Sequence, residues 1–268
     1  MTFRAGICLI VLATLLSAPC AAPPASEPAP RPAVQDRIER LVASIAAVNR
    51  GEPDEGIPAK ADGLQGVADG DRESLLLQLV LFLAKHPENE PTMGAALLID
   101  FYQFTKAEKI AALVPYLDTD DGRLRDAMYQ VLSTVDRPDG AGPDFAPYDA
   151  VLRDSENASA GLIRYLYEVS PIDALAATAR AYAGDDAAAR AVRRALQLER
   201  LRAGQDAGRT ADSEQARREV DALSRDAAWW LRLYAAHLVR TDPDLGSPEI
   251  VERLRSDSHG LVQQALAG

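Results

Sequence analysis

The three histidines are the first residues to consider for catalysis or metal binding. They stand at His86, His237 and His259, and no two of them share the spacing of a metal-ligand pair. Both cysteines, Cys8 and Cys20, lie in the first 22 residues, so the remaining chain has no thiolate to complete a zinc site. A G-x-S-x-G nucleophile elbow and a glycine-rich phosphate loop are also missing from the sequence. We therefore expect no catalytic, metal-binding or cofactor-binding residue and no enzymatic activity.

Two acidic segments resemble calcium-binding loops only superficially. In the segment 118–122, Gly122 is the fifth residue, whereas the twelve-residue calcium loop requires glycine at the sixth position. The twelfth position is Tyr129, where the loop requires a bidentate Glu. The segment 242–246 has the same mismatched spacing. Both segments are interpreted as polar turns between helices.

A predicted helix over residues 226–240 is the segment best suited to partner recognition. At 100° per residue, Trp229 and Leu233 lie about opposite the apolar stripe that contains Leu231 and Leu238, so this helix makes contacts on two sides. Two interpretations stay open: a tryptophan fills a gap between helical units, or Trp229 is an exposed anchor flanked by arginines. The candidate partner-binding residues are Trp229, Trp230, Arg232, Leu233 and Arg240.

The elements that position these residues recur along the chain. An apolar residue before a turn returns every 31 to 40 residues, which is typical of a solenoid of stacked helical units. The residue three positions after each of these anchors is always polar, and five of the six side chains suit a helix N-cap. The anchors are Leu83, Leu117, Leu152, Ala183, Leu223 and Leu254, and the residues beyond them are His86, Asp120, Ser155, Asp186, Asp226 and Asp257.

Three of these units resemble the HEAT-repeat family, in the short form also found in phycobilisome-lyase-like proteins. The resemblance is carried by residues 117–132 (LDTDDGRLRDAMYQVL), 223–238 (LSRDAAWWLRLYAAHL) and 254–266 (LRSDSHGLVQQAL). Arg125 and Arg232 match the family's usual arginine in the second helix, whereas the last unit has Gln263 there. The resemblance covers residues 71–268 and implies an all-α fold, an α-solenoid of about five to six helical hairpins.

The segments before this array are predicted to be of four kinds. Residues 1–22 have a basic start, an apolar run and small residues, as in a bacterial secretory signal peptide. Lipidation of Cys20 is the alternative, and it would anchor the chain to a membrane. Residues 23–33 form a Pro/Ala-rich disordered tether, residues 34–50 an amphipathic helix, and residues 51–70 a loop or linker.

The net charge of −11 opposes binding to nucleic acid and to anionic lipid surfaces.

The long step between the units at 183 and 223 predicts a loop near residues 202–208 that borders a partner site. We expect a periplasmic or secreted repeat scaffold that binds a protein or peptide partner. The alternatives are a lipid-anchored structural spacer and an enzyme-accessory protein similar to the lyase-like relatives, which attach chromophores.

Overall fold

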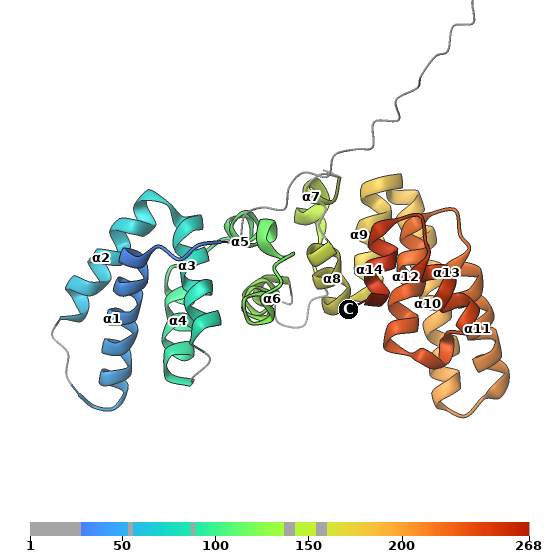
Figure 1. The fold of residues 1–268 in the computed structure, drawn as a ribbon, viewed down its shortest axis with the longest axis horizontal. Helices are drawn as coiled ribbons and strands as arrows, with labels where there is room; N and C mark the ends of the chain where they lie inside the picture. The colour runs from blue at the N-terminus through green and yellow to red at the C-terminus, as the bar shows by residue number, and fades with distance from the viewer. Residues whose placement is uncertain (1–27, 53–55, 87–88, 137–142, 154–159, 268) are drawn as a thin grey trace, which may run out of the picture.

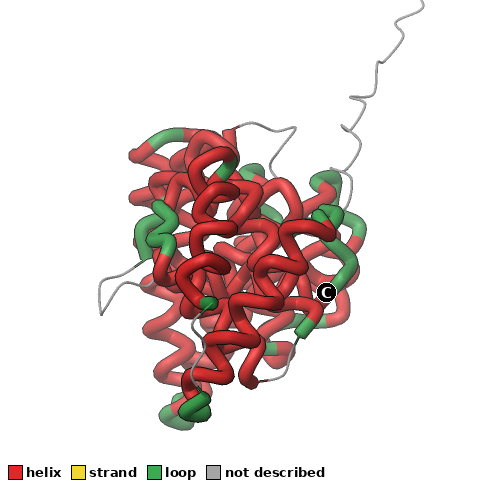
Figure 2. Tube along the Cα trace, turned by 90° about the vertical axis from the view of Figure 1, so that its left-hand side faces the viewer, coloured by secondary structure: helices red, strands yellow, loops and turns green. Residues whose placement is uncertain are grey.

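The computed structural model of the protein is all-helical (Figure 1, Figure 2). It describes residues 28–52, 56–86, 89–136, 143–153 and 160–267, and within these ranges no strand is found. No helix in the described ranges has both the length and the apolar character needed to cross a membrane. The expected all-α class is therefore confirmed.

The helices follow one another with short connections. The first part comprises α1 (Pro32–Asn49), α2 (Ile57–Gly70), α3 (Arg72–Lys85), α4 (Asn89–Phe101), α5 (Lys106–Leu113), η1 (Val114–Tyr116) and α6 (Gly122–Asp136). The second part comprises η2 (Ala146–Tyr148), α7 (Asp149–Arg153), α8 (Ala160–Val169), α9 (Pro171–Ala183), α10 (Asp185–Asp206), α11 (Thr210–Ser224), α12 (Trp229–Thr241), η3 (Pro243–Leu245), α13 (Pro248–Arg255) and α14 (Gly260–Ala267).

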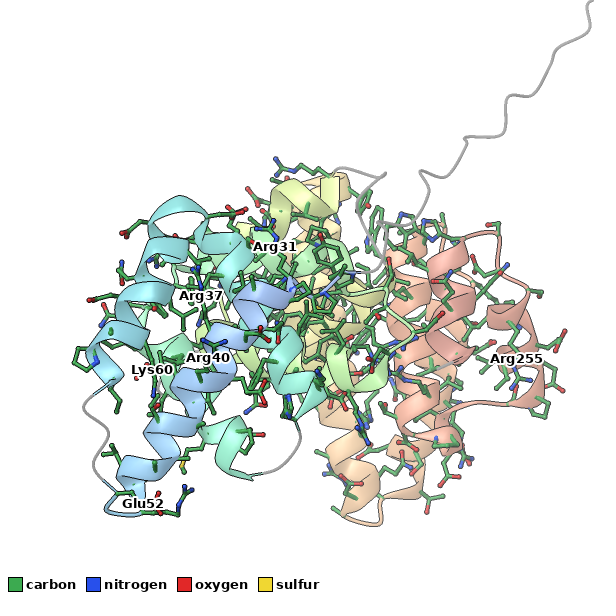
Figure 3. The ribbon with its side chains drawn as sticks, turned by 60° about the vertical axis from the view of Figure 1, so that its left-hand side comes forward. Arg31, Arg37, Arg40, Glu52, Lys60 and Arg255 are labelled. Atoms are coloured by element: carbon green, nitrogen blue, oxygen red, sulfur yellow. The ribbon has the colours of Figure 1, made fainter. Side chains whose placement is uncertain are left out.

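The predicted helix at 34–50 is confirmed as α1, but the loop predicted at 51–70 is wrong. Residues 57–70 form α2, which packs against α1 and buries Leu64 completely. A proline in the first turn of α2 favours helix initiation. The three glycines of α2 have low helix propensity, and for this reason the sequence pattern predicted a loop. Polar contacts also join the pair, because Arg37 donates to the Gly63 carbonyl at 3.0 Å and Lys60 donates to Ser44 at 2.6 Å. Figure 3 shows Arg37 and Lys60 along this junction.

The end of the predicted tether is part of the folded structure. Pro32 begins α1, and the Arg31 amide donates to the Gln78 side-chain carbonyl at 2.7 Å. The Gln78 amide group in turn donates to the Ala29 carbonyl at 3.3 Å. Gln78 is buried in the otherwise apolar helix α3, so these bonds satisfy its polar group. The signal peptide, residues 23–27 of the tether, Cys20 and Ser155 lie outside the described residues.

The acidic positions of the repeat lie near helix starts, but most do not cap as predicted. Asp121 rather than Asp120 caps α6, and its Oδ1 accepts two first-turn amides at 2.9 and 3.2 Å. Asp226 and Asp257 accept the amide two residues ahead at 3.0 and 2.8 Å, in turns that precede α12 and α14. Asp186 lies within the first turn of α10. An Asp-containing turn and a helix cap use the same residue types, so sequence alone does not separate them.

Helix α10 also differs from the expectation. It continues to residue 206, and only residues 207–209 separate it from α11. The break predicted at 202–208 is therefore shorter and lies further along the chain. Helix α10 has 22 residues and packs against both α9 and α11, so the long step in the repeat lies mainly in this one helix.

The C-terminal helix returns to the middle of the chain. Helix α14 packs against α12 and also against α8, and α12 contacts α9, so α8, α9, α12 and α14 form one packed group. At the other side of α8, Gly161 lies against the turn after η1. Asp118 Oδ1 accepts the Gly161 amide at 2.6 Å, and a Cβ on Gly161 would lie 2.2 Å from the Leu117 carbonyl oxygen.

We expect Gly161→Ala to destabilise the protein by about 1–3 kcal/mol or more, because the added methyl group meets rigid backbone. The matched control is Gly63→Ala, at a helical position with no atom within 4 Å of the added carbon. That change should stabilise the protein by about 0.5–1 kcal/mol through helix propensity. Urea unfolding of both variants measures the difference, and equal stabilities would contradict the close approach at Gly161.

Candidate protein-binding surface

Trp229, the main candidate from the sequence, lies in an aromatic cluster at the start of α12. Its ring stacks on His259 with centroids 4.0 Å apart and planes 5° apart. Trp230 and Tyr182 meet the same ring edge-on at 6.0 and 4.9 Å. Tyr182 comes from α9 and was not predicted, because no spacing in the sequence relates it to position 229. One face of Trp229 is thus covered by the protein itself.

Arg232 is occupied by an internal ion pair. Its guanidinium donates to both carboxylate oxygens of Asp257 at 2.6 and 2.9 Å, and its side chain is 14% exposed. A further hydrogen bond to the Asp226 carbonyl at 2.8 Å holds the turn before α12. The Arg232 hydrogen bonds hold the pKa of Asp257 below its usual value. Arg232 therefore joins α12 to the turn before α14.

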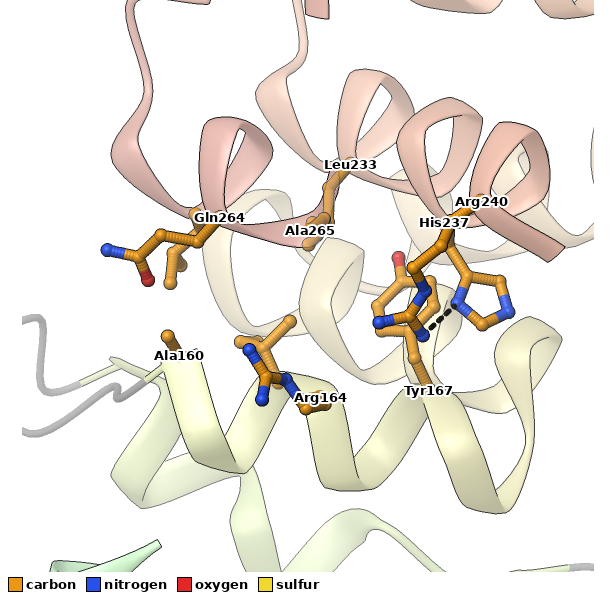
Figure 4. Close-up of a pocket in the computed structure, with 10 residues that line it drawn as sticks. Ala160, Arg164, Tyr167, Leu233, His237, Arg240, Gln264 and Ala265 are labelled. Carbon is orange, nitrogen blue, oxygen red and sulfur yellow. Dashed lines mark hydrogen bonds between the residues drawn. The ribbon is translucent and has the colours of Figure 1, made fainter. Parts of the chain in front are cut away.

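Leu233 is buried one helical turn from Trp229, and Arg240 lies further along the same helix. Leu233 is 1% exposed, and Arg240 lies 11 residues from Trp229, which is roughly 16 Å along a helix axis. Both line a narrow hollow between α8, α12 and α14 (Figure 4). The structure thus brings Trp229 and Trp230 together, buries Leu233 and places Arg240 elsewhere.

The hollow contains a buried histidine. His237 lies with its ring centroid 5.1 Å from that of Tyr167, and the Arg240 guanidinium is 3.4 Å from His237 Nδ1 (Figure 4). Burial, together with the nearby cations of Arg240 and Arg202, lowers the pKa of His237 to about 4. His237 is therefore neutral at pH 7 and serves as a core residue.

A buried carboxylate, Asp136, lies at the end of α6, between the first and second groups of helices. Asp136 is 0% exposed, and it accepts from the hydroxyls of Tyr148 and Tyr165 at 2.7 and 2.5 Å. The Lys106 ammonium lies 2.7 Å from the second carboxylate oxygen and also donates to the Asp144 carbonyl. This cluster has the residue types of an acid–base site, but its carboxylate is closed to substrate. We assign it a structural role.

An exposed apolar stripe runs along α4. Met93, Leu97 and Phe101 are 52%, 47% and 68% exposed, and their i, i+4, i+8 spacing places them on one face. The other exposed large apolar side chains in the described ranges are Val48 of α1, Tyr182 of α9 and Leu196 of α10. Single exposed apolar residues are ordinary, whereas a stripe of three makes α4 a candidate interaction surface.

A cleft lies beside this stripe, between α3, α4, α5 and α6. It is lined by Ala96 and Ile99 of α4 and by the buried Lys109 of α5. The Lys109 ammonium donates to Thr134 at 3.1 Å, and burial lowers the pKa of this lysine. Gln103 at the cleft has φ +48°, a left-handed conformation that non-glycine residues rarely adopt. Strained backbone of this kind is enriched at binding sites.

Comparison with known proteins returned no matching family model, no matching curated protein and no matching solved structure. The resemblance to HEAT repeats therefore rests on the sequence motifs alone and stays a prediction. Among the described residues, no group of three His, Cys, Asp or Glu side chains is arranged to hold a metal ion.

The low pKa of His237 predicts a stability change with pH. In the unfolded chain His237 is protonated below about pH 6.5, whereas in the folded chain it stays neutral down to about pH 4. The stability is therefore fully retained above pH 6.5 and decreases as the pH falls from 6.5 to 4. As the pH falls from 6.5 to 4, the free energy of unfolding of the wild type should decrease by about 3 kcal/mol relative to that of His237→Gln. Denaturant melts at several pH values measure it, and parallel curves for the two proteins would contradict a neutral buried histidine.

Proposed function

We propose that the chain is an α-solenoid of about five to six HEAT-like helical hairpins that binds a protein partner and catalyses no reaction. The packing of consecutive helices supports this proposal: α3 with α4, α5 with α6, α9 with α10, α11 with α12, and α13 with α14. Contacts between successive pairs, such as α3 with α6 and α10 with α11, agree with stacked units. The repeat number rests on the sequence periodicity.

The proposed contact surface is the stripe on α4, and its exposure is the observation that carries the proposal. An apolar stripe of i, i+4, i+8 residues fits the packing of one amphipathic helix against another. Phe101, at 68% exposure, supplies the largest apolar area of the stripe, and aromatic residues are enriched in interface centres. The occupant that fits this surface is an amphipathic helix of the partner, with apolar residues facing α4.

The proposed location is the bacterial cell envelope or the exterior. This part of the proposal rests on the signal-like residues 1–22, and attachment through a lipid on Cys20 is the alternative. The negative charge makes a protein partner a better fit than nucleic acid.

The triple variant Met93→Ser, Leu97→Ser, Phe101→Ser tests the proposed surface. A partner is first isolated from envelope extract with the wild-type protein and purified, and its affinity for each variant is then measured by calorimetry. Loss of three apolar contacts should weaken binding at least about 100-fold, because central interface side chains each contribute 1 kcal/mol or more.

The matched control is Leu196→Ser, which removes an exposed leucine of similar exposure on α10. It should leave the affinity unchanged. Helical circular dichroism and melting should be alike for all proteins, because the substituted side chains are exposed. A triple variant that binds the purified partner as tightly as wild type would contradict the role of α4.

A further inference from the structure

The cleft between α4 and the pair α5 and α6 has the size of a small-molecule site. Its volume is about 380 Å³, and ligand pockets in proteins commonly have about 300–1,000 Å³. The hollow at His237 has only about 30 Å³, which is room for roughly one or two water molecules. Helix α3 packs against α4, α5 and α6 and contributes Leu83 to the cleft. Of the two spaces, only the cleft admits a small organic molecule.

The apolar walls of the cleft are held in place. They are formed by Leu83, Ile99, Phe104 and Val131, none of which is more than 8% exposed. Phe104 lies in the linker between α4 and α5, and the Arg72 guanidinium lies 5.0 Å from its ring centroid. Arg72 in turn donates to Glu108 at 2.5 Å, so this contact is fixed on both sides. A pre-formed apolar wall favours binding because little ordering is required when a ligand enters.

Lys109 brings a positive charge to the wall of this cleft. The residue is 8% exposed, and within the described ranges its ammonium makes one hydrogen bond, to Thr134 at 3.1 Å. Both residues line the cleft. Lys106, which precedes it in α5, is paired with the Asp136 carboxylate, whereas Lys109 forms no ion pair with the described residues. An ammonium has three donors, so two of them are available to a ligand.

The charges around Lys109 do not offset its burial. Burial lowers the pKa of Lys109, and the carboxylates of Asp100 and Asp136 act in the opposite direction without reversing the shift. Asp136 is already paired with Lys106, and Asp100 lies exposed on α4 beside the cleft. A buried charge is costly unless a counter-ion and hydrogen bonds replace its hydration. The carboxylate of a ligand would supply both.

We propose that this cleft binds a small monocarboxylate with a short apolar chain, whose carboxylate pairs with Lys109 and whose chain lies against Ile99 and Phe104. A hydrogen bond between two charged groups is about twice as strong as one between neutral groups, and the buried position of Lys109 strengthens it. The apolar chain adds binding energy in proportion to the area that it buries. The site takes a small ligand, so it does not depend on a protein partner at the α4 stripe.

Titration of the full chain with hexanoate tests the site. The amide signals of the ¹⁵N-labelled protein are followed by NMR, with no partner protein present. Saturable shifts at the residues that line the cleft, including Gln130 and Thr134, are expected. The absence of saturation up to about 20 mM, or saturable shifts confined to other helices, would overturn the proposal.

Four ligand controls isolate the chemistry. Hexanamide has the same chain without the charge, hexylammonium has the opposite charge, and acetate has the charge without the chain. Each should bind about tenfold more weakly than hexanoate or worse. Equal binding of any of them would overturn recognition of an apolar carboxylate. N-acetylglutamate amide presents a carboxylate as a partner's side chain would, and tighter binding of this compound than of hexanoate would overturn the small-molecule assignment.

Protein variants locate the site. Lys109→Met keeps the apolar stem and removes the ammonium, so it should weaken hexanoate binding about tenfold or more and leave hexanamide binding unchanged. Asp100→Asn, at an exposed position that does not endanger folding, removes a like charge and should tighten hexanoate binding about twofold. The matched control is Lys60→Met, at the junction of α1 and α2, which should bind normally. Unchanged hexanoate binding by folded Lys109→Met or by Asp100→Asn would overturn the assignment.

Discussion

The structure depends on one buried carboxylate. Asp136 ends α6 and is completely enclosed, and its hydrogen-bond and ion-pair partners come from three other elements: Lys106 of α5, Tyr148 of η2 and Tyr165 of α8. A buried charge is tolerated only where partners replace its hydration, so these elements must meet at one point. The burial of Asp136 therefore ties the N-terminal helices to α8, and α8 in turn supports α9 and α14.

The exposed surfaces of the N-terminal and C-terminal helices differ. In the C-terminal group, Arg232 and its partner Asp257 fasten α12 to the start of α14, and His259 covers the rear face of Trp229. With one ring face on His259, Trp229 stays partly exposed beside Tyr182 and Trp230. At the other end, the apolar face of α4 that carries Phe101 has no covering helix among the described residues. The proposed protein-binding surface is this face of α4.

The sequence predicted much of the helical pattern and less of the long-range chemistry. The apolar spacing of Leu124, Met128 and Leu132 predicts α6 because one face of that helix meets the core, and all three side chains are buried there. Helix α2 was not predicted, because its glycines and proline are typical of a loop and its packing against α1 is not visible in the sequence. The partners of Asp136 are up to 30 residues away, so no local pattern identifies them. Tyr182 was missed as a neighbour of Trp229 for the same reason.

Urea unfolding of Asp136→Asn tests most directly the claim that this buried carboxylate holds the fold together. Removing the charge leaves Lys106 unpaired and disturbs the two tyrosine hydroxyls, so we expect a loss of about 3–5 kcal/mol. The reference is Glu52→Gln, which breaks the exposed pair with Arg50 and should cost less than about 1 kcal/mol. An Asp136→Asn protein within about 1 kcal/mol of wild type would contradict the central role of this carboxylate.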